Sequence, residues 1–87
     1  MYKVRFTKNA LKQLKKLDQS VAALILGWIR KNLEGCDDPR RHGKALVANR
    51  SGQWRYRVGD YRIIAEIIDK DIVIMVVNIG HRSDVYK

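Results

Sequence analysis

The spacing of apolar residues changes its period once along this chain, and that change constrains the fold more than any other feature. From Ala10 to Leu33, apolar side chains recur at the three- and four-residue intervals of amphipathic helices. From Trp54 to Ile79 they alternate instead, as in strands that bury one face. Helices followed by strands favour an α+β fold in which the helices cover one face of the sheet.

The first half of the chain predicts one strand and two helices. Apolar and basic residues alternate over residues 2–6, which indicates a half-buried strand. Thr7 is suited to cap the first helix, and a second helix is expected over residues 20–34, with Gly35 just beyond its end. The link between the helices is short, so they should form an antiparallel hairpin.

The second half predicts a loop and then a sheet. Residues 36–53 are rich in charges and turn formers and are expected to be a loop. Three strands with two short turns follow, at 54–58, 61–68 and 72–79, with turns at 59–60 and 69–71. The predicted order is β-α-α-β-β-β, a single domain over residues 1–87 in which an N-terminal helical hairpin packs on one face of a mostly antiparallel sheet.

These turns also predict which side chains share a face. The first turn places Arg57 opposite Arg62, and a three-residue second turn pairs Ile68 with Ile72. The face expected to pack on the helices is wholly apolar or aromatic: Trp54, Tyr56, Val58, Tyr61, Ile63, Ala65, Ile67, Val73, Met75, Val77 and Ile79. The other face is basic at one end and apolar at the other: Arg55, Arg57, Arg62, Ile64, Glu66, Ile68, Ile72, Ile74, Val76 and Asn78. Only Asn78 disfavours the alternative register of the second hairpin.

The charge of the chain points to an anionic partner. Eighteen Lys and Arg against nine Asp and Glu give a net charge of +9 on 87 residues. Nucleic acid and an acidic protein both fit such a balance. Cys36 is the only cysteine, which excludes an internal disulfide and suits a reducing cytoplasm, and no apolar run is long enough to span a membrane. Neither a metal site nor a nucleotide-binding loop is expected.

The arginines near the first turn are candidates for an anion site. Arg55, Arg57 and Arg62 stack like charges, which costs stability. They are either solvated, or paired with Glu66 and a terminal carboxylate, or they bind phosphate. The last strand should bring His81, Arg82 and Tyr86 to the same end of the sheet. Such a set could cut RNA without a metal, because a histidine titrates near neutrality, guanidinium groups stabilise the phosphorane, and Tyr86 or Trp54 could stack on a base.

A second group of cations lies on the first helix and in the loop. It comprises Lys12, Lys15, Lys16, Arg40, Arg41 and Lys44. These side chains either form a solvated face or contact the phosphates of an RNA backbone, and both interpretations remain open.

The chain resembles the RelE-type toxins of bacterial type II toxin–antitoxin systems, within the RelE/ParE superfamily. The resemblance rests on five segments: 11–17, 38–40, 44–46, 54–62 and 80–86. It implies a ribosome-dependent endoribonuclease that cleaves mRNA in the A site by 2′-hydroxyl attack, without a cofactor. The residues that the family uses correspond here to Arg55, Arg57, Arg62, Arg82 and Tyr86. Arginine is a poor base, so the role of general base or acid would pass to His81.

The resemblance also implies partners. A cognate RelB-like antitoxin, acidic and largely helical, would neutralise a toxin that is monomeric alone and part of a hetero-oligomer in the complex. The other partners would be the ribosome and mRNA. Three alternatives stand beside this hypothesis: a ParE-like toxin that inhibits gyrase, an RNA- or DNA-binding module without catalysis, and an inactive toxin-like protein.

Overall fold

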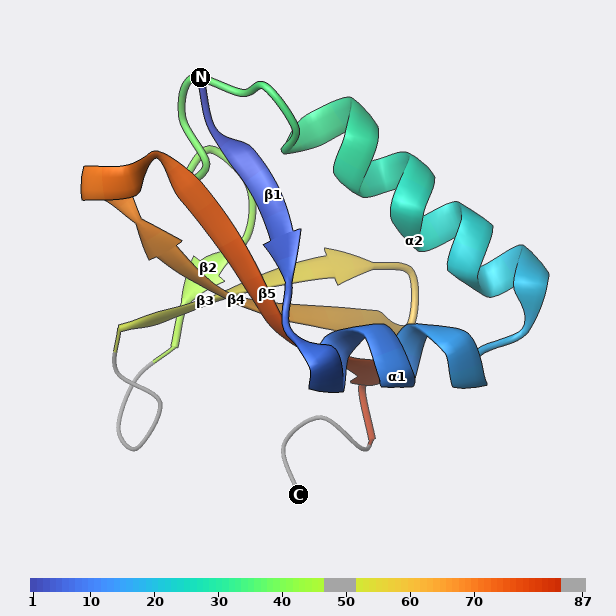
Figure 1. Cartoon of the computed structure of the whole chain (residues 1–87). Helices are drawn as coiled ribbons and strands as arrows, with labels where there is room; N and C mark the ends of the chain where they lie inside the picture. Colours follow the sequence, from blue (N-terminus) through green and yellow to red (C-terminus); the bar gives the residue numbers. More distant parts are fainter. Residues whose placement is uncertain (47–51, 84–87) are drawn as a thin grey trace.

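The computed structural model describes residues 1–46 and 52–83 and confirms the α+β architecture (Figure 1). The order of elements is β1 (Lys3–Phe6), α1 (Lys8–Lys16), α2 (Gln19–Asn32), β2 (Lys44–Ala45), β3 (Gln53–Val58), β4 (Tyr61–Ile68), the short 3-10 helix η2 (Asp69–Asp71) and β5 (Val73–His81). The predicted strands and helices are all present, with ends that differ by one or two residues.

One mixed sheet carries both helices on one side (Figure 1). Its strand order is β1-β5-β4-β3-β2, with β1 parallel to β5 and the other neighbours antiparallel. Helix α1 packs beside β5, and α2 crosses back toward β3. No helix in the described part of the chain is both long and apolar enough to cross a membrane.

The helix ends explain how the first half of the chain is fixed. The Thr7 hydroxyl accepts a hydrogen bond from the Ala10 N–H at 3.1 Å, so Thr7 caps α1 as expected. Helix α2 ends at Asn32, two residues earlier than predicted. Gly35 adopts a φ of +76°, which suits glycine, and its N–H bonds to the Tyr2 carbonyl at 2.7 Å. This bond ties the end of α2 to the start of β1.

The hydrophobic core lies between the helices and the sheet. Ile25 and Leu33 from the helical half meet Tyr56 and Ile63 from the strands, and all four are fully buried. The Tyr56 hydroxyl donates a 2.6 Å hydrogen bond to the Pro39 carbonyl. Burial raises the pKa of Tyr56 well above its usual range, so this phenol stays protonated.

The predicted register of the second hairpin is wrong. In the first part of β5, the residues predicted to face the core and those predicted to face away from it change places. Strand β4 pairs with β5 through Ile68 and Val73 rather than Ile72, because η2 and a left-handed residue make a four-residue turn. Ile74 and Val76 are therefore fully buried in the core, where Val73, Met75 and Val77 were expected. An irregularity opposite Ile64 and Ala65 shifts the register again, so that Ile79 faces the core as predicted.

The predicted loop over residues 36–53 contains a strand. Lys44 and Ala45 form β2, which pairs with Arg55 and Trp54 at the edge of the sheet. The chain can approach β3 so closely because residue 43 is glycine. A Cβ at Gly43 would overlap the carbonyl oxygen of Arg55.

Candidate functional site

Four cations occupy two neighbouring rows on the sheet face that carries no helix. Arg57 pairs with Arg62 in one row, and Lys44 pairs with Arg55 in the other. Arg55 and Arg57 are two residues apart on β3, so their side chains project from the same face. We call Lys44, Arg55, Arg57 and Arg62 the basic face. The structure confirms the predicted pairing of Arg57 with Arg62 and of Arg55 with Ile64.

Three cations of the basic face have no ion pair within residues 1–46 and 52–83: Lys44, Arg55 and Arg57. Arg57 is exposed, whereas the Nε atom of Arg55 is buried and has no hydrogen-bond partner among the described residues. A buried donor that lacks a partner costs free energy. Carboxylate or phosphate oxygens that approach this face would find cationic donors available.

Arg62 is held differently from its neighbours. Only 8% of Arg62 is exposed, and its Nη1 atom points to the carbonyls of Gly59 and Tyr61 at 3.4 and 3.3 Å. These contacts hold the guanidinium beside the β3–β4 turn. A buried charge is costly unless it is hydrogen-bonded, so these carbonyls help to stabilise the Arg62 guanidinium where it lies.

The end of β5 brings a further arginine toward this face. Gly80 pairs with Arg62, and Arg82 follows Gly80 by two residues, in the turn just beyond the end of β5 at His81. The Arg82 N–H donates to the Asp60 carbonyl at 2.8 Å, which extends the ladder by one bond. Tyr86 lies outside the described residues.

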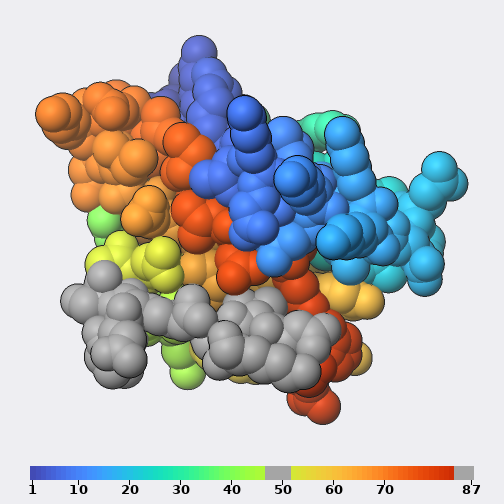
Figure 2. All heavy atoms as spheres, turned by 60° about the horizontal axis from the view of Figure 1, so that its bottom comes forward, coloured from blue at the N-terminus to red at the C-terminus, as the bar shows by residue number. Residues whose placement is uncertain are grey.

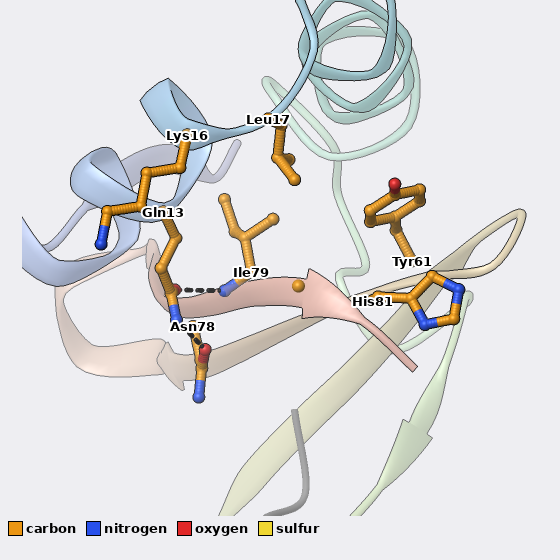
Figure 3. A pocket seen from close by; sticks show the side chains of 8 residues that line it. Gln13, Lys16, Leu17, Tyr61, Asn78, Ile79 and His81 are labelled. Carbon is orange, nitrogen blue, oxygen red and sulfur yellow. Dashed lines mark hydrogen bonds between the residues drawn. The ribbon is translucent and has the colours of Figure 1, made fainter. Parts of the chain in front are cut away.

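His81 reaches the expected end of the sheet but projects from the opposite face. It pairs with Tyr61, and the two rings meet edge to face with centroids 5.6 Å apart. Tyr61 is next to Arg62 in β4, so its side chain and that of His81 point to the helix side, away from the basic face. Together with Gln13 and Lys16 of α1, they line a cavity of about 340 Å³ (Figure 3).

The same cavity shows how α1 closes the sheet edge. The Gln13 side chain accepts a 2.6 Å hydrogen bond from the Ile79 N–H and donates a 2.6 Å bond to Asn78 (Figure 3). Strand β1 pairs with β5 only as far as Val76, so α1 supplies the partner for the exposed edge beyond it.

Trp54 and Arg40, both predicted to bind RNA, are engaged in the fold. Trp54 faces the helix side, and its Nε1 donates to the His42 carbonyl at 2.6 Å. Arg40 makes two hydrogen bonds to Asp69, at 3.0 and 2.9 Å, and lies 6.0 Å from the Trp54 ring. Arg40, and then the Tyr2 hydroxyl, lower the pKa of Asp69 to about 2. These contacts fasten the 36–43 segment to the β4–β5 turn.

The remaining predicted cations are exposed. Lys12, Lys15 and Lys16 all lie on α1, which stands beside the end of β5 in Figure 2. Arg41 is exposed on the segment before β2, close to the end of α2. The lysines therefore belong to α1, whereas the cations of the basic face belong to β2, β3 and β4.

Sequence reasoning missed the place of Lys44 in the basic face. We had predicted that Lys44 lies in a loop, because a two-residue strand leaves almost no alternation to detect. The one local signal is Gly43, whose small size permits the close approach to Arg55. Three or more His, Cys, Asp or Glu side chains do not gather around any point in the described residues, as they would around a metal ion.

Comparison with known proteins gives the family. The model of the family described as "ParE toxin of type II toxin-antitoxin system, parDE" matches residues 4–86. Toxin RelG of Mycobacterium tuberculosis is 31% identical over 99% of this chain and 97% of its own.

Solved structures agree with this result. The toxin–antitoxin complex RelBE2 of M. tuberculosis contains a chain that matches with a TM-score of 0.85 and 31% identity, over 95% of this chain and 93% of that one. The RelE–RelB complex of Pyrococcus horikoshii matches with a TM-score of 0.71 and 29% identity, over 97% and 98%. The chain therefore belongs to the ParE toxin family of type II toxin–antitoxin systems. Within that family, its similarity to RelG and to the matching chain of the RelBE2 complex identifies it as a RelE-type toxin.

Proposed function

We propose that this toxin is a ribosome-dependent endoribonuclease, which cleaves mRNA in the ribosomal A site and so inhibits translation. The observation that carries the proposal is the basic face, where Arg57 and Arg62 are directly opposite each other and Lys44 and Arg55 form the next row. Like charges in opposite positions destabilise a sheet. An anionic ligand explains this arrangement better than folding stability does.

The chemistry of RNA cleavage suits such a face. Attack by the 2′-hydroxyl puts extra negative charge on the phosphate, and cations fixed beside it stabilise that transition state. Guanidinium groups match phosphate oxygens with two parallel N–H donors and stay protonated at any relevant pH. We therefore assign Arg55, Arg57 and Arg62 to phosphate binding. Arg82 would contact the same phosphate or the leaving group, and Tyr86 would stack on the nucleotide.

The basic face is exposed at Arg57, and no helix of the described residues covers it. Cleavage in line needs the attacking and leaving oxygens to be held on opposite sides of the phosphorus atom. RNA that binds at Arg57 would be held on one side only, so ribosomal RNA and the mRNA path would supply the rest of the site.

The lysines of α1 would bind the ribosome rather than the scissile phosphate. Lys12, Lys15 and Lys16 are exposed and project from a different surface than the basic face. We propose that they, with Arg41, contact the ribosomal RNA backbone. Each phosphate contact steepens the salt dependence of binding by about one unit in a log–log plot. Replacement of the three lysines by glutamine should flatten that slope without a change in the rate of bound complexes.

A cognate antitoxin is the proposed inhibitor. Two structural neighbours are toxin–antitoxin complexes, and the net charge of +9 favours an acidic partner. A largely helical, RelB-like antitoxin would neutralise the toxin in a hetero-oligomer, while the free toxin would be monomeric. Both would act in the cytoplasm, where ribosomes are.

The test is induced expression without the antitoxin, followed by mapping of mRNA 5′ ends. The proposal predicts new ends within translated codons, which disappear when initiation is blocked and in the Arg57→Gln variant. Intact mRNA with stalled gyrase–DNA complexes would instead indicate gyrase inhibition, the activity of the ParE branch. RNA that is bound on ribosomes but never cut would indicate a binding module. Either result would refute the proposal.

A further inference from the structure

His81 makes two contacts that involve the same ring nitrogen. Its Nδ1 atom accepts a hydrogen bond from the backbone N–H of Ser83 at 3.2 Å and lies 2.9 Å from the Ser83 hydroxyl oxygen. A backbone N–H can only donate, so Nδ1 must present its lone pair. A neutral imidazole has one N–H and one acceptor nitrogen, which places the proton of His81 on Nε2.

In this tautomer, neither ring nitrogen of His81 is available to accept a proton. Nδ1 is used within the turn, and Nε2 already carries hydrogen. The ring also projects from the helix side of the sheet, where it meets Tyr61, while Arg57 and Arg62 project from the other side. To accept a proton at the basic face, His81 would have to break the bond to Ser83 and leave its own face.

The turn that His81 closes contains one residue, Arg82. On the amino side, the Arg82 N–H is bonded to the Asp60 carbonyl at 2.8 Å. On the carboxyl side, the next residue, Ser83, is bonded to His81. Arg82 thus has a hydrogen bond on its own amide and another on the following amide. It lies in the turn just beyond β5, two residues after Gly80, the strand partner of Arg62.

We propose that His81 is a positioning residue, whose Nδ1 atom holds the 81–83 turn and thereby directs Arg82 toward the phosphate bound at the basic face. The inference rests on the proposed function for its catalytic consequence, but the turn itself can be tested separately. It replaces the expectation that His81 transfers a proton.

His81→Asn is the decisive variant, because the Asn Oδ1 atom can occupy nearly the position of Nδ1 but cannot transfer a proton. Single-turnover cleavage of mRNA on purified ribosomes should stay within about threefold of wild type in this variant. His81→Gln, whose amide reaches the Nε2 position, and His81→Ala should both lose at least tenfold, as should Arg82→Ala. His81→Ala combined with Arg82→Ala should cost no more than Arg82→Ala alone. An Asn variant as slow as the Ala variant would overturn the inference and return His81 to proton transfer.

Amide hydrogen exchange separates this inference from the proposed function. The Ser83 amide should be protected in wild type and in His81→Asn and should exchange freely in His81→Ala, whether or not the protein cuts RNA. Nitrogen NMR of the imidazole should find the proton on Nε2. If wild type never cleaves RNA but these signals hold, the proposed function fails while the turn stands. An unprotected Ser83 amide in wild type, or a proton on Nδ1, overturns the inference itself.

Discussion

Replacement of Arg57 by glutamine should make the protein more stable and less active. Arg57 is exposed, lies directly opposite Arg62 and forms no ion pair with any described residue. Its charge therefore repels Arg62, and within residues 1–46 and 52–83 no ion pair of Arg57 offsets that repulsion. If the basic face exists to bind phosphate, removal of one charge relieves the repulsion and weakens the site.

The magnitude follows from the pairing. Opposite Cβ atoms on a sheet lie about 5 Å apart, and exposed side chains can splay to about 6–8 Å at their ends. Two unit charges at that distance in water repel by about 0.5–0.7 kcal/mol. Screening at physiological salt leaves about 0.2–0.3 kcal/mol, and the burial of Arg62 raises the value toward about 1 kcal/mol, the upper range for cross-strand pairs.

Urea unfolding and single-turnover cleavage test the two halves of this prediction. With a denaturant dependence of about 1 kcal/mol per molar urea, the midpoint of Arg57→Gln should rise by at least about 0.2 M, and the gain should vanish in 1 M salt. Cleavage should fall about 10²–10³-fold, the usual cost of one charge-stabilising donor. Lys70→Gln, an exposed cation on η2, is the matched control and should change neither quantity. A less stable Arg57→Gln variant, or one that cleaves normally, would refute the reasoning.

Three further predictions concern the fold. Arg40 lowers the pKa of Asp69 to about 2, so their hydrogen bond stabilises the fold above the unfolded pKa, near 3.8, and this stability is lost as pH falls toward 2. The Asp69→Asn variant should not show this acid-dependent loss in unfolding curves. An acid unfolding curve identical to that of wild type would contradict the prediction. Ile72 is a β-branched residue at φ +56°, so Ile72→Gly should raise the free energy of unfolding by about 1 kcal/mol, which corresponds to a urea midpoint higher by about 1 M. A lower midpoint would argue against the left-handed turn. Ile74→Ala should lower the free energy of unfolding by about 2–5 kcal/mol, because Ile74 is fully buried, while Met75→Ala should lower it distinctly less. A larger loss in Met75→Ala than in Ile74→Ala would instead support the register predicted from sequence.

The first hairpin was predictable because its information is local. Gly59 and Asp60 specify a two-residue turn, and the length of the turn fixes the register in which β3 and β4 pair. The pairing of Arg57 with Arg62, and hence most of the basic face, follows from those two residues. The Thr7 cap and the helix periodicity are local in the same sense.

The parts that sequence reasoning missed depend on contacts between distant segments. Both faces of β5 are largely apolar, so alternation could not decide between the two registers, and the turn at Ile72 required a backbone conformation that isoleucine rarely adopts. Strand β2 exists only because Gly43 fits against β3. The face of His81 follows from Ile79, which faces the core as predicted, because His81 comes two residues later in the same strand.

The most direct test of the central claim compares one mRNA in two states with the same purified toxin. The mRNA is supplied free in solution, or bound to purified ribosomes with an empty A site, and the products are mapped at single-turnover concentrations. We expect cleavage within the A-site codon on ribosomes, no cleavage of the free mRNA, and loss of cleavage on ribosomes in Arg57→Gln. Equal cleavage in both states, or no cleavage in either, would contradict the account.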